Sequence, residues 1–381
     1  MKNLEALSEK LKNKKGFSLN MIIGLDGFVD EIIHLVDKRQ DFENFTRIRT
    51  IAEYGERISR AAGLSTNIEM VSVQTKLGGN GPILSNALLE YGVELTYVGA
   101  LGKPDIHPVF RPMTEKARAV YSLCEAGRSD ACEFEDGKII MGKISCLGGL
   151  TWDVFKDGMG GAEGIAAMIN KSQLFGMENW TMIPHMSEIW EGLIAEVFPL
   201  LEVKGGAEKP LAFFDLADPE KRTREDIYRA MKLIGRFEEK FRAILGLNEK
   251  EVFAIAEVLG VQPANGSPAD KLKNTVMETY KQLGIYCLVV HPVRSACCAI
   301  NGEYFYTDGP YCEKPVLTTG AGDNFNAGFC LGQSLGLDPL SALNLGVSTS
   351  GFYVRYAKSP TYEEVINFVE KWSAGKTEAL N

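Results

Sequence analysis

Apolar residues along the chain recur with two periods that alternate from segment to segment. Short apolar runs typical of buried strands occur in TMIPHM (181–186), PLAFFDLAD (210–218) and CLVVHPV (287–293), and stretches with a helical period lie between them. From Thr319 to the C-terminus the chain is mainly helical. Alternating strands and helices favour a parallel sheet with helices on both faces, so we predict an α/β fold, a three-layer α/β/α sandwich.

The N-terminal third follows the same scheme. Leu4, Leu7 and Leu11 recur at helical spacing and predict a short amphipathic helix. Residues 21–37 open as a core strand, turn at two glycines and resume as a second strand, and residues 42–62 carry an amphipathic helical pattern. A glycine-rich loop, KLGGNGP, then leads into the helix ILSNALLEYG and the strand VELTYVGALG, which indicates a βαβ unit.

Residues 117–147 depart from this rhythm. Short alternating runs are separated by turn residues, which is the pattern of antiparallel hairpins, so a small sheet is expected to interrupt the α/β core here. We expect Val120, Ile139 and Met141 to face a substrate or a partner. Charged residues such as Glu133 are expected on the outer face and turns.

Composition and charge narrow the range of partners. The 381 residues carry a net charge of −9 and no window gathers five or six basic residues, which argues against nucleic acid or an anionic membrane surface. No stretch reaches about 18 apolar residues and no apolar segment opens the chain, so neither a membrane span nor a signal peptide is predicted. The eight cysteines form no Cys-x-x-Cys pair, which favours reduced thiols in a cytoplasmic protein over a zinc site.

The densest chemical signal is PVLTTGAGDNFNAGFCLGQSLG (315–336). A β-like run ends in a glycine-rich turn, and from Asp323 the apolar residues suit a buried helix. The amides of Gly320, Ala321 and Gly322 would therefore point at an anion bound at a helix N-terminus. A carboxylate beside that anion repels phosphate, but it suits a base that takes a proton from an attacking hydroxyl. The alternative is that Asp323 is an ordinary helix N-cap.

Two common nucleotide-binding motifs do not fit the chain. The turn at 320–325 ends in Phe325, where the dinucleotide fingerprint needs a third glycine. The segment GKIIMGK (137–143) approaches a P-loop, but Ile144 stands where Ser or Thr must ligate magnesium. A dinucleotide-dependent oxidoreductase is therefore disfavoured.

One resemblance joins several of these segments. TTGAGDNFNAGF (318–329) closely resembles the C-terminal signature of the ribokinase-like (PfkB) carbohydrate kinases, Asp-Thr-x-Gly-Ala-Gly-Asp-x-Phe. Three further segments resemble motifs of that family in the same order along the chain, namely GLDGFVDEI (24–32), GGNGPILSNALLEYG (78–92) and LNEKEV (247–252). The resemblance covers roughly residues 20–372 and implies the ribokinase-like sandwich with a small β-sheet lid.

The resemblance also implies roles for single residues. The matching position for the catalytic base is Asp323, and those for the anion hole are Gly320, Ala321 and Gly322. Asp30, Gly79 and Asn80 match the sugar-binding positions. Thr319 and Asn248 match the nucleotide-binding positions, and Glu251 and Asn248 match the positions linked to the metal. The implied cofactors are ATP and Mg²⁺. Asn at an N-cap with Glu three residues later is also a plain capping pattern, which is compatible with the metal role.

The chain departs from the family's pattern at three places. Leu317 stands where the family's signature begins with an aspartate that helps to bind an activating monovalent cation in several members, so activation by potassium is left open. Ile83 replaces the asparagine of the double-glycine loop, and Asn80 offers an amide nearby. His291, Pro292 and Val293 replace the Thr-x-Gly of the nucleotide-side strand.

The implied organisation is one kinase domain over residues 1–381, with a lid formed by about 31–37 and 117–147. A lid made of one open sheet leaves an apolar face and unpaired strand edges, which are usually buried against a partner. We therefore expect a homodimer through the two lids.

These observations predict a cytoplasmic, ATP- and magnesium-dependent kinase that transfers the γ-phosphoryl group to a primary hydroxyl of a small sugar or sugar-like substrate. The alternative is a catalytically degenerate protein of the same fold that binds or regulates. The changes at Leu317 and 291–293 favour that alternative, and the intact Asp323 and glycine turn oppose it. Ribose, fructose, a keto-deoxy acid and a nucleoside all remain open as substrates.

Overall fold

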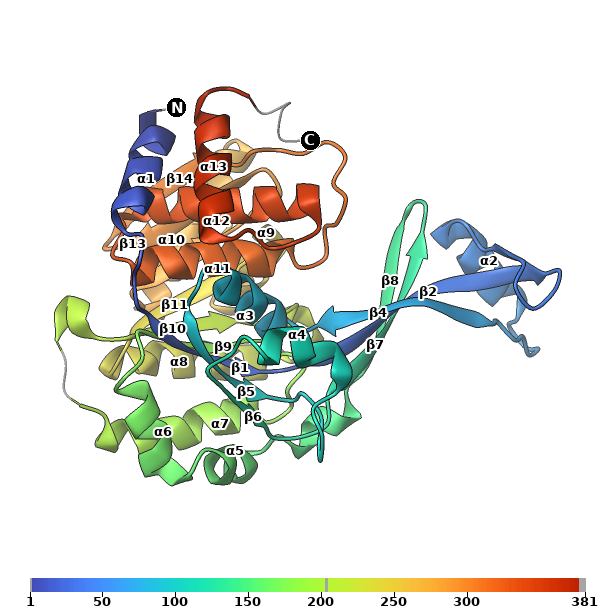
Figure 1. Cartoon of the computed structure of the whole chain (residues 1–381), viewed down its shortest axis with the longest axis horizontal. Coiled ribbons are helices and arrows are strands. Elements are labelled where there is room, and N and C mark those ends of the chain that lie inside the picture. Colours follow the sequence, from blue (N-terminus) through green and yellow to red (C-terminus); the bar gives the residue numbers. More distant parts are fainter. Residues whose placement is uncertain (1, 203–204, 377–381) are drawn as a thin grey trace.

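A nine-stranded sheet forms the centre of the computed structural model, which describes residues 2–202 and 205–376 (Figure 1). Its strands, in spatial order, are β14 (Glu303–Asp308), β13 (Ser295–Ile300), β12 (Cys287–Val290), β11 (Arg242–Leu247), β10 (Leu211–Asp215), β9 (Leu174–Met177), β1 (Asn20–Leu25), β5 (Glu94–Gly99) and β6 (Ala119–Ser122). The strands from β12 to β6 run parallel, and β13 and β14 add an antiparallel edge.

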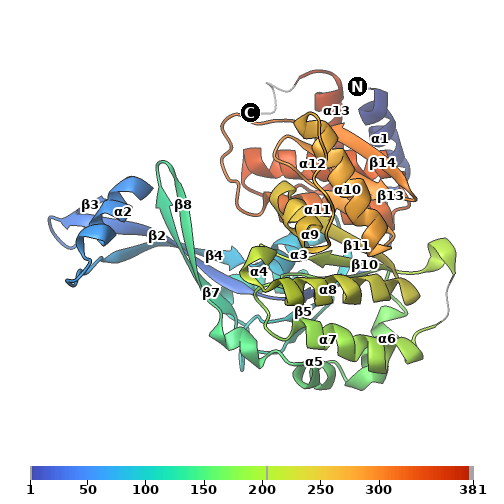
Figure 2. The ribbon, with the colours of Figure 1, turned by 180° about the vertical axis from the view of Figure 1, so that it is seen from behind.

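Helices cover both faces of this sheet, as the two opposite views show (Figures 1 and 2). One face carries α5 (Trp152–Gly158), α6 (Gly161–Ile169), α7 (Met186–Gly192), α8 (Arg224–Arg236), α9 (Glu249–Val258) and α10 (Pro268–Leu283). The other carries α1 (Lys2–Asn13), α3 (Asn80–Glu90), α4 (Arg111–Thr114), α11 (Ala321–Ser334), α12 (Pro339–Tyr356) and α13 (Tyr362–Ser373). The predicted α/β/α sandwich is thus confirmed. No helix in the described ranges is long and apolar enough to cross a membrane.

Alternation along the strands divides the apolar side chains between two cores. In β10, Leu211 and Phe213 point to the core under α11, while Ala212 and Phe214 point to the core under α8. Successive side chains of a strand face opposite sides, so a strand covered by helices on both faces must be apolar throughout. The continuous run LAFF therefore marks a central strand.

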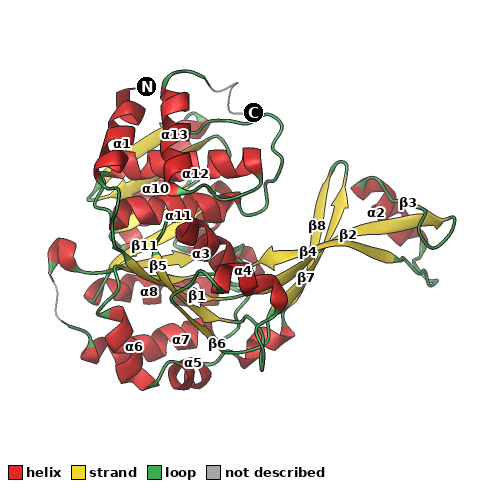
Figure 3. Cartoon of the chain, in the orientation of Figure 1, coloured by secondary structure: helices red, strands yellow, loops and turns green. Residues whose placement is uncertain are grey.

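A second, smaller sheet projects from the sandwich as an arm (Figure 3). It consists of β2 (Phe28–Arg39), β3 (Phe45–Arg47), β4 (Met70–Gly78), β7 (Gly127–Phe134) and β8 (Gly137–Lys143), with α2 (Ile51–Arg60) on one face. We call this unit the lid. It is continuous with the sandwich, because β2 follows β1 after a two-residue break.

Three sequence predictions need correction here. Residues 119–122 form β6, an edge strand of the main sheet paired with β5, so Val120 does not belong to the lid. Residues 181–186 form turns and the start of α7, not a strand; Ile183 is buried there because Arg222 donates to the carbonyls of Trp180, Thr181 and Ile183 and holds the turn on the core. The helical pattern at 42–62 yields a helix only from Ile51, where a capping box of Thr50 and Glu53 begins it.

Side chains of the lid face opposite sides from those predicted. Ile33, Cys132 and Ile139 lie side by side across β2, β7 and β8 and pack beneath α2. Glu133, which was expected on the outside, lines a cavity between the lid and the sandwich. The side-chain period of a strand is two, so an error of one position in the expected orientation exchanges the two faces.

Candidate active site

Polar side chains follow the carboxyl ends of five parallel strands. Asp26 comes directly after β1, Glu178 after β9, Asn248 after β11 and His291 after β12, while Asp215 is the last residue of β10. These strands are neighbours in the sheet, so their ends meet along one edge. Open α/β sheets bind ligands at this edge.

The glycine-rich turn TTGAG (318–322), which was predicted to bind an anion, faces the same edge of the sheet. We call it the anion turn. Gly320 has a φ of 91°, a left-handed conformation that glycine adopts without strain, and α11 begins at the next residue. The amide of Ala321 donates to the Thr318 carbonyl at 3.1 Å and closes the turn. Asp323 lies in the first turn of α11 and is buried.

Asn80 contacts the predicted base directly. Its side-chain amide donates to Asp323 Oδ1 at 3.0 Å and lies 3.5 Å from Asp215 Oδ1. Gly79, with a φ of 95°, turns the chain so that Asn80 opens α3 at this place. The structure therefore brings together two of the predicted motifs, the double-glycine loop and the anion turn, through one hydrogen bond.

Asp26 holds this loop in place. Its carboxylate accepts from the backbone amides of Asn80 (3.0 Å) and Gly81 (2.9 Å) and from the Asn179 side chain (2.7 Å). The side chain is fully buried, and this burial raises the pKa of Asp26 to about 6. The three hydrogen-bond donors act in the opposite direction and lower it. Asp26 therefore supports the loop from beneath.

Three buried carboxyl groups, those of Asp26, Glu178 and Asp215, gather around the base. Burial and the neighbouring charge of Asp26 raise the pKa of Asp323 to about 8. Burial together with neighbouring acids holds the pKa of Glu178 and of Asp215 well above the usual range. Asp215 accepts from the Ala217 amide and the Asn326 side chain, whereas neither oxygen of Glu178 has a hydrogen-bond partner among the described residues.

Sequence reasoning missed Asp26, Glu178 and Asp215. A signal was present, because each follows or ends an apolar strand run: IIGL before Asp26, LFGM before Glu178 and LAFF before Asp215. A buried carboxyl group with no partner, such as Glu178, is costly unless a ligand or a proton satisfies it.

Asp30 lies on the lid side of the site. It lines a cavity of about 620 Å³ together with Gln74, Lys76 and Glu133 of the lid and Thr319 of the anion turn. The Ser129 hydroxyl donates to Asp30 Oδ1 at 2.5 Å. Asp30 also packs against Gly78, where a Cβ would lie 2.2 Å from Asp30 Oδ2, so this position must be glycine.

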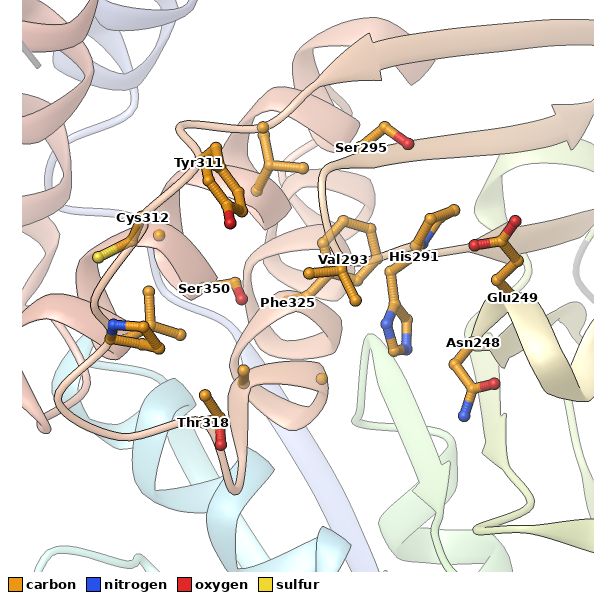
Figure 4. A pocket seen from close by; sticks show the side chains of 18 of the residues that line it. Asn248, Glu249, His291, Val293, Ser295, Tyr311, Cys312, Thr318, Phe325 and Ser350 are labelled. Atoms are coloured by element: carbon orange, nitrogen blue, oxygen red, sulfur yellow. The ribbon is translucent and has the colours of Figure 1, made fainter. Parts of the chain in front are cut away.

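A second cavity, of about 770 Å³, lies on the other side of the anion turn. It is lined by Asn248 and His291 at the strand ends, by Thr318 and Gly322 of the turn, and by Phe325 of α11 (Figure 4). Thr318, not the predicted Thr319, therefore lines this cavity; Thr319 Oγ1 instead accepts a bond from Lys138 of the lid at 3.3 Å. The two cavities meet at the turn that leads to Asp323.

Asn248 and Glu251 form a complete capping box at the start of α9. Asn248 Oδ1 accepts from the Glu251 amide, and Glu251 Oε2 accepts from the Asn248 amide at 2.8 Å. The other oxygen of Glu251 accepts from the Asp218 amide at 2.9 Å. The capping role of this pair is thus confirmed.

A nine-stranded sandwich, a projecting lid and a buried aspartate at a glycine turn define a kinase of the ribokinase-like class. Ribokinase from Thermotoga maritima has the same fold, with a TM-score of 0.61, 16% identity and coverage of 93% of this chain and 100% of that one. A structure described as ribokinase II from E. coli, in complex with ATP and Mg²⁺, gives a TM-score of 0.59 at 17% identity over 93% and 100% of the two chains.

The family model for prokaryotic ketohexokinases matches residues 4–372. The chain belongs to that family and is an ATP-dependent sugar kinase. It is also 27% identical to the ketohexokinase of Haloferax volcanii, over 91% of this chain and 90% of that protein. Nothing in these comparisons favours the catalytically degenerate alternative.

Proposed function

We propose that the protein phosphorylates a primary hydroxyl of a ketohexose with ATP. The substrate class is that in the name of the family and of its haloarchaeal relative. The observation that carries the reaction is the position of Asp323, which is buried at the start of α11, directly after the anion turn, whose residues line both cavities.

Asp323 acts as the general base. The ionised carboxylate takes the proton of the sugar hydroxyl as the hydroxyl oxygen attacks the γ-phosphorus. The new sugar O–P bond forms while the bond between the γ-phosphorus and the β–γ bridging oxygen breaks, and ADP leaves with the electron pair. Asp323 then returns its proton to solvent after the sugar phosphate departs.

The anion turn stabilises the phosphoryl group during transfer. We assign the amides of Gly320 and Gly322 to the charge that gathers on the phosphoryl oxygens; the amide of Ala321, also predicted for this role, already donates to the Thr318 carbonyl. Preorganised donors at a helix N-terminus favour such charge and need no rearrangement when the reaction occurs. The cavity of about 770 Å³ on the α9 side is large enough for a nucleotide, and its apolar lining includes Val293 and Phe325.

Asn248 and Glu251 are the residues we assign to the magnesium side of the nucleotide. Their fit is indirect, because both Glu251 oxygens already accept from backbone amides and keep only their remaining lone pairs for bound water. Magnesium bound with the nucleotide would neutralise phosphate charge. Asn248 also lines the nucleotide cavity, so its side chain is placed to contact the phosphates.

The sugar is assigned to the lid side. Asp30, which lines the lid-side cavity, and Gly79 and Asn80 of the double-glycine loop are the contacts we propose. Lys76 and Glu133 bring further polar groups from the lid over the sugar. A closed lid would exclude water from the transferring phosphoryl group.

A homodimer through the lids and a cytoplasmic location are further parts of this proposal. Among the described residues β8 pairs only with β7, and Ile140, on the face of this strand that points away from α2, is exposed. A second copy of the chain is the partner that such a face fits best.

A substrate screen tests the proposed function. Release of ADP is measured with fructose and other ketohexoses, with ribose and other aldoses, and with nucleosides, and the product of each active sugar is assigned by phosphorus NMR. We expect the highest kcat/KM with a ketohexose and a phosphate on a primary carbon. Efficient phosphorylation of ribose or a nucleoside with no reaction of ketohexoses would contradict the proposal.

A further inference from the structure

His291 stands at the end of β12 inside the nucleotide cavity. Its backbone amide donates to the Leu247 carbonyl at 3.0 Å, which extends the pairing of β12 with β11 by one residue. The side chain is therefore fixed beside Asn248, the residue that follows β11. Both side chains point into the cavity, near the turn that carries Thr318 (Figure 4).

The imidazole ring packs against the anion turn. A Cβ on Gly322 would lie 3.0 Å from His291 Cε1 and 3.5 Å from Nε2, so only glycine at position 322 lets the ring approach this closely without a shift. On another side the ring lies 5.1 Å from the Phe325 ring, between their centroids. These two contacts hold the ring at a constant place beside the amides of the turn.

The bonding of the ring is incomplete in the free protein. No hydrogen bond joins either ring nitrogen to another residue in the described ranges of the chain. Burial lowers the pKa of His291 to about 4, so the ring is neutral at pH 7 and has one N–H donor and one acceptor nitrogen. A half-buried donor that points into a cavity is available to a ligand.

Few cationic groups are available to a polyphosphate in this cavity. Of the described residues that line it, Lys250 is the one lysine and none is an arginine. Lys250 is well exposed and already pairs with Glu220 at 2.6 Å and with Asp218 at 3.6 Å. Phosphate oxygens that reach the anion turn would therefore depend on backbone amides and on neutral side-chain donors, and the His291 ring, which packs against Gly322 of the turn, is one of these.

We propose that His291 donates a hydrogen bond from its ring to a non-bridging phosphate oxygen of the bound nucleotide and so positions the γ-phosphoryl group over the anion turn. The proposal rests on the assignment of this cavity to the nucleotide. The role is one of positioning, since no proton or phosphoryl group passes through the ring.

Two variants separate the donor from the packing. His291→Phe keeps a ring against Gly322 and Phe325 but removes the N–H, and His291→Gln keeps a donor. Binding of the non-hydrolysable analogue AMP-PNP with Mg²⁺, and of adenosine, is measured by calorimetry on the full chain.

We expect His291→Phe to weaken AMP-PNP binding on the order of 10- to 100-fold, the usual size of a hydrogen bond to a charged group, while adenosine binding stays within about 2-fold. His291→Gln should recover most of the loss. His185→Gln, at the exposed start of α7, is the control.

A measurement on the unmodified protein covers the case in which a variant does not fold. The ring ¹⁵N resonances of His291 should move when AMP-PNP binds and stay in place when adenosine binds. Unchanged AMP-PNP affinity in His291→Phe, or resonances that ignore AMP-PNP, would overturn the role of His291 and leave the kinase assignment intact. If the wild-type protein binds neither ligand, the nucleotide assignment of the cavity fails, and this proposal fails with it.

Discussion

Asn80 donates its side-chain amide to Asp323 at 3.0 Å and lies 3.5 Å from an oxygen of Asp215. One neutral donor thus stands between two buried carboxyl groups. The hydrogen bond from Asn80 stabilises the ionised form of Asp323, so this bond lowers the pKa of Asp323. Burial and the charge of Asp26 act in the opposite direction and raise that pKa. A base must be ionised to act, and Asn80 therefore favours the active form.

Replacing Asn80 by leucine removes the donor at a similar volume. We expect kcat/KM for the sugar to fall about 10-fold or more at pH 7, and the rise of kcat/KM with pH to move to higher pH, because Asp323 loses the bond that lowers its pKa. The pH profile of the wild type should rise as the pH passes about 8, where the base ionises. Asn274→Leu, on an exposed part of α10, is the control. A lower rate with no displacement of the profile would mean that Asn80 contacts only substrate.

The residues of the site differ in how far sequence could predict them. Asp323 and its glycine turn are contiguous, and the chemistry of a turn that opens a helix is visible in one segment. Asp26, Glu178 and Asp215 come from three separate strands, and only the order β10-β9-β1 places them side by side. Asp26 could not be distinguished from Asp30 as a ligand, because its burial depends on the loop that folds over it.

At the scale of elements, the lid has two unlike faces. The face under α2 is packed with Ile33, Leu35, Cys132 and Phe134. The opposite face carries Asp30 toward the sandwich and Ile140 farther out, and Ile140 is 57% exposed. α2 therefore supplies the lid with a core of its own, and the sugar-side face keeps an apolar outer part that a second lid would bury.

The dimer prediction belongs to this element. Sedimentation velocity should give a particle of twice 41.9 kDa for the wild type at micromolar concentration. Ile140→Lys should shift it toward the single chain, because a charge replaces apolar surface at the expected contact. Tyr228→Lys, at an exposed position on α8, should leave the dimer unchanged. A wild-type protein that sediments as one chain would contradict the dimer but not the kinase.

The lid was also the part of the fold that the sequence predicted least well. Its strands were recognised as hairpins, but β4 was not predicted, because its apolar residues Met70, Val71 and Val73 form only a short run and most of the strand is exposed. The faces of β8 were exchanged, since a strand exposed on both sides has no apolar alternation strong enough to set its orientation. Among the central strands, the apolar runs of β1, β5, β10 and β12 were predicted, but β9 and β11 were not, and residues 181–186, expected as a strand, form turns and the start of α7.

At the scale of the whole molecule, the buried carboxyl groups lower the free energy of unfolding at the pH where they are ionised for catalysis. Asp26 and Asp323 have pKa values raised to about 6 and about 8, and the pKa values of Glu178 and Asp215 are also raised well above the usual range. The folded protein therefore binds more protons than the unfolded chain above pH 4. Stability falls as pH rises wherever the folded state binds the extra protons.

We expect the melting temperature to fall between pH 5 and pH 9. Asp323→Asn should melt higher than the wild type at pH 9, by roughly 1–2 °C for each kcal/mol of relieved charge, and at nearly the same temperature at pH 5, where the wild-type Asp323 is already neutral. Differential scanning calorimetry across this range is the measurement. Asp153→Asn, at an exposed position on α5, should show no such difference. A larger gain at pH 5 than at pH 9 would contradict the raised pKa.

The most direct test of the central claim is the turnover of Asp323→Asn with a sugar that the wild type phosphorylates. The variant keeps the size of the side chain and the start of α11 but cannot take a proton from the hydroxyl. We predict that kcat falls at least ~100-fold, which is the usual size of the effect when a general base is removed. AMP-PNP should bind with nearly wild-type affinity. Turnover close to that of the wild type would show that Asp323 only begins a helix, and would contradict the proposed mechanism.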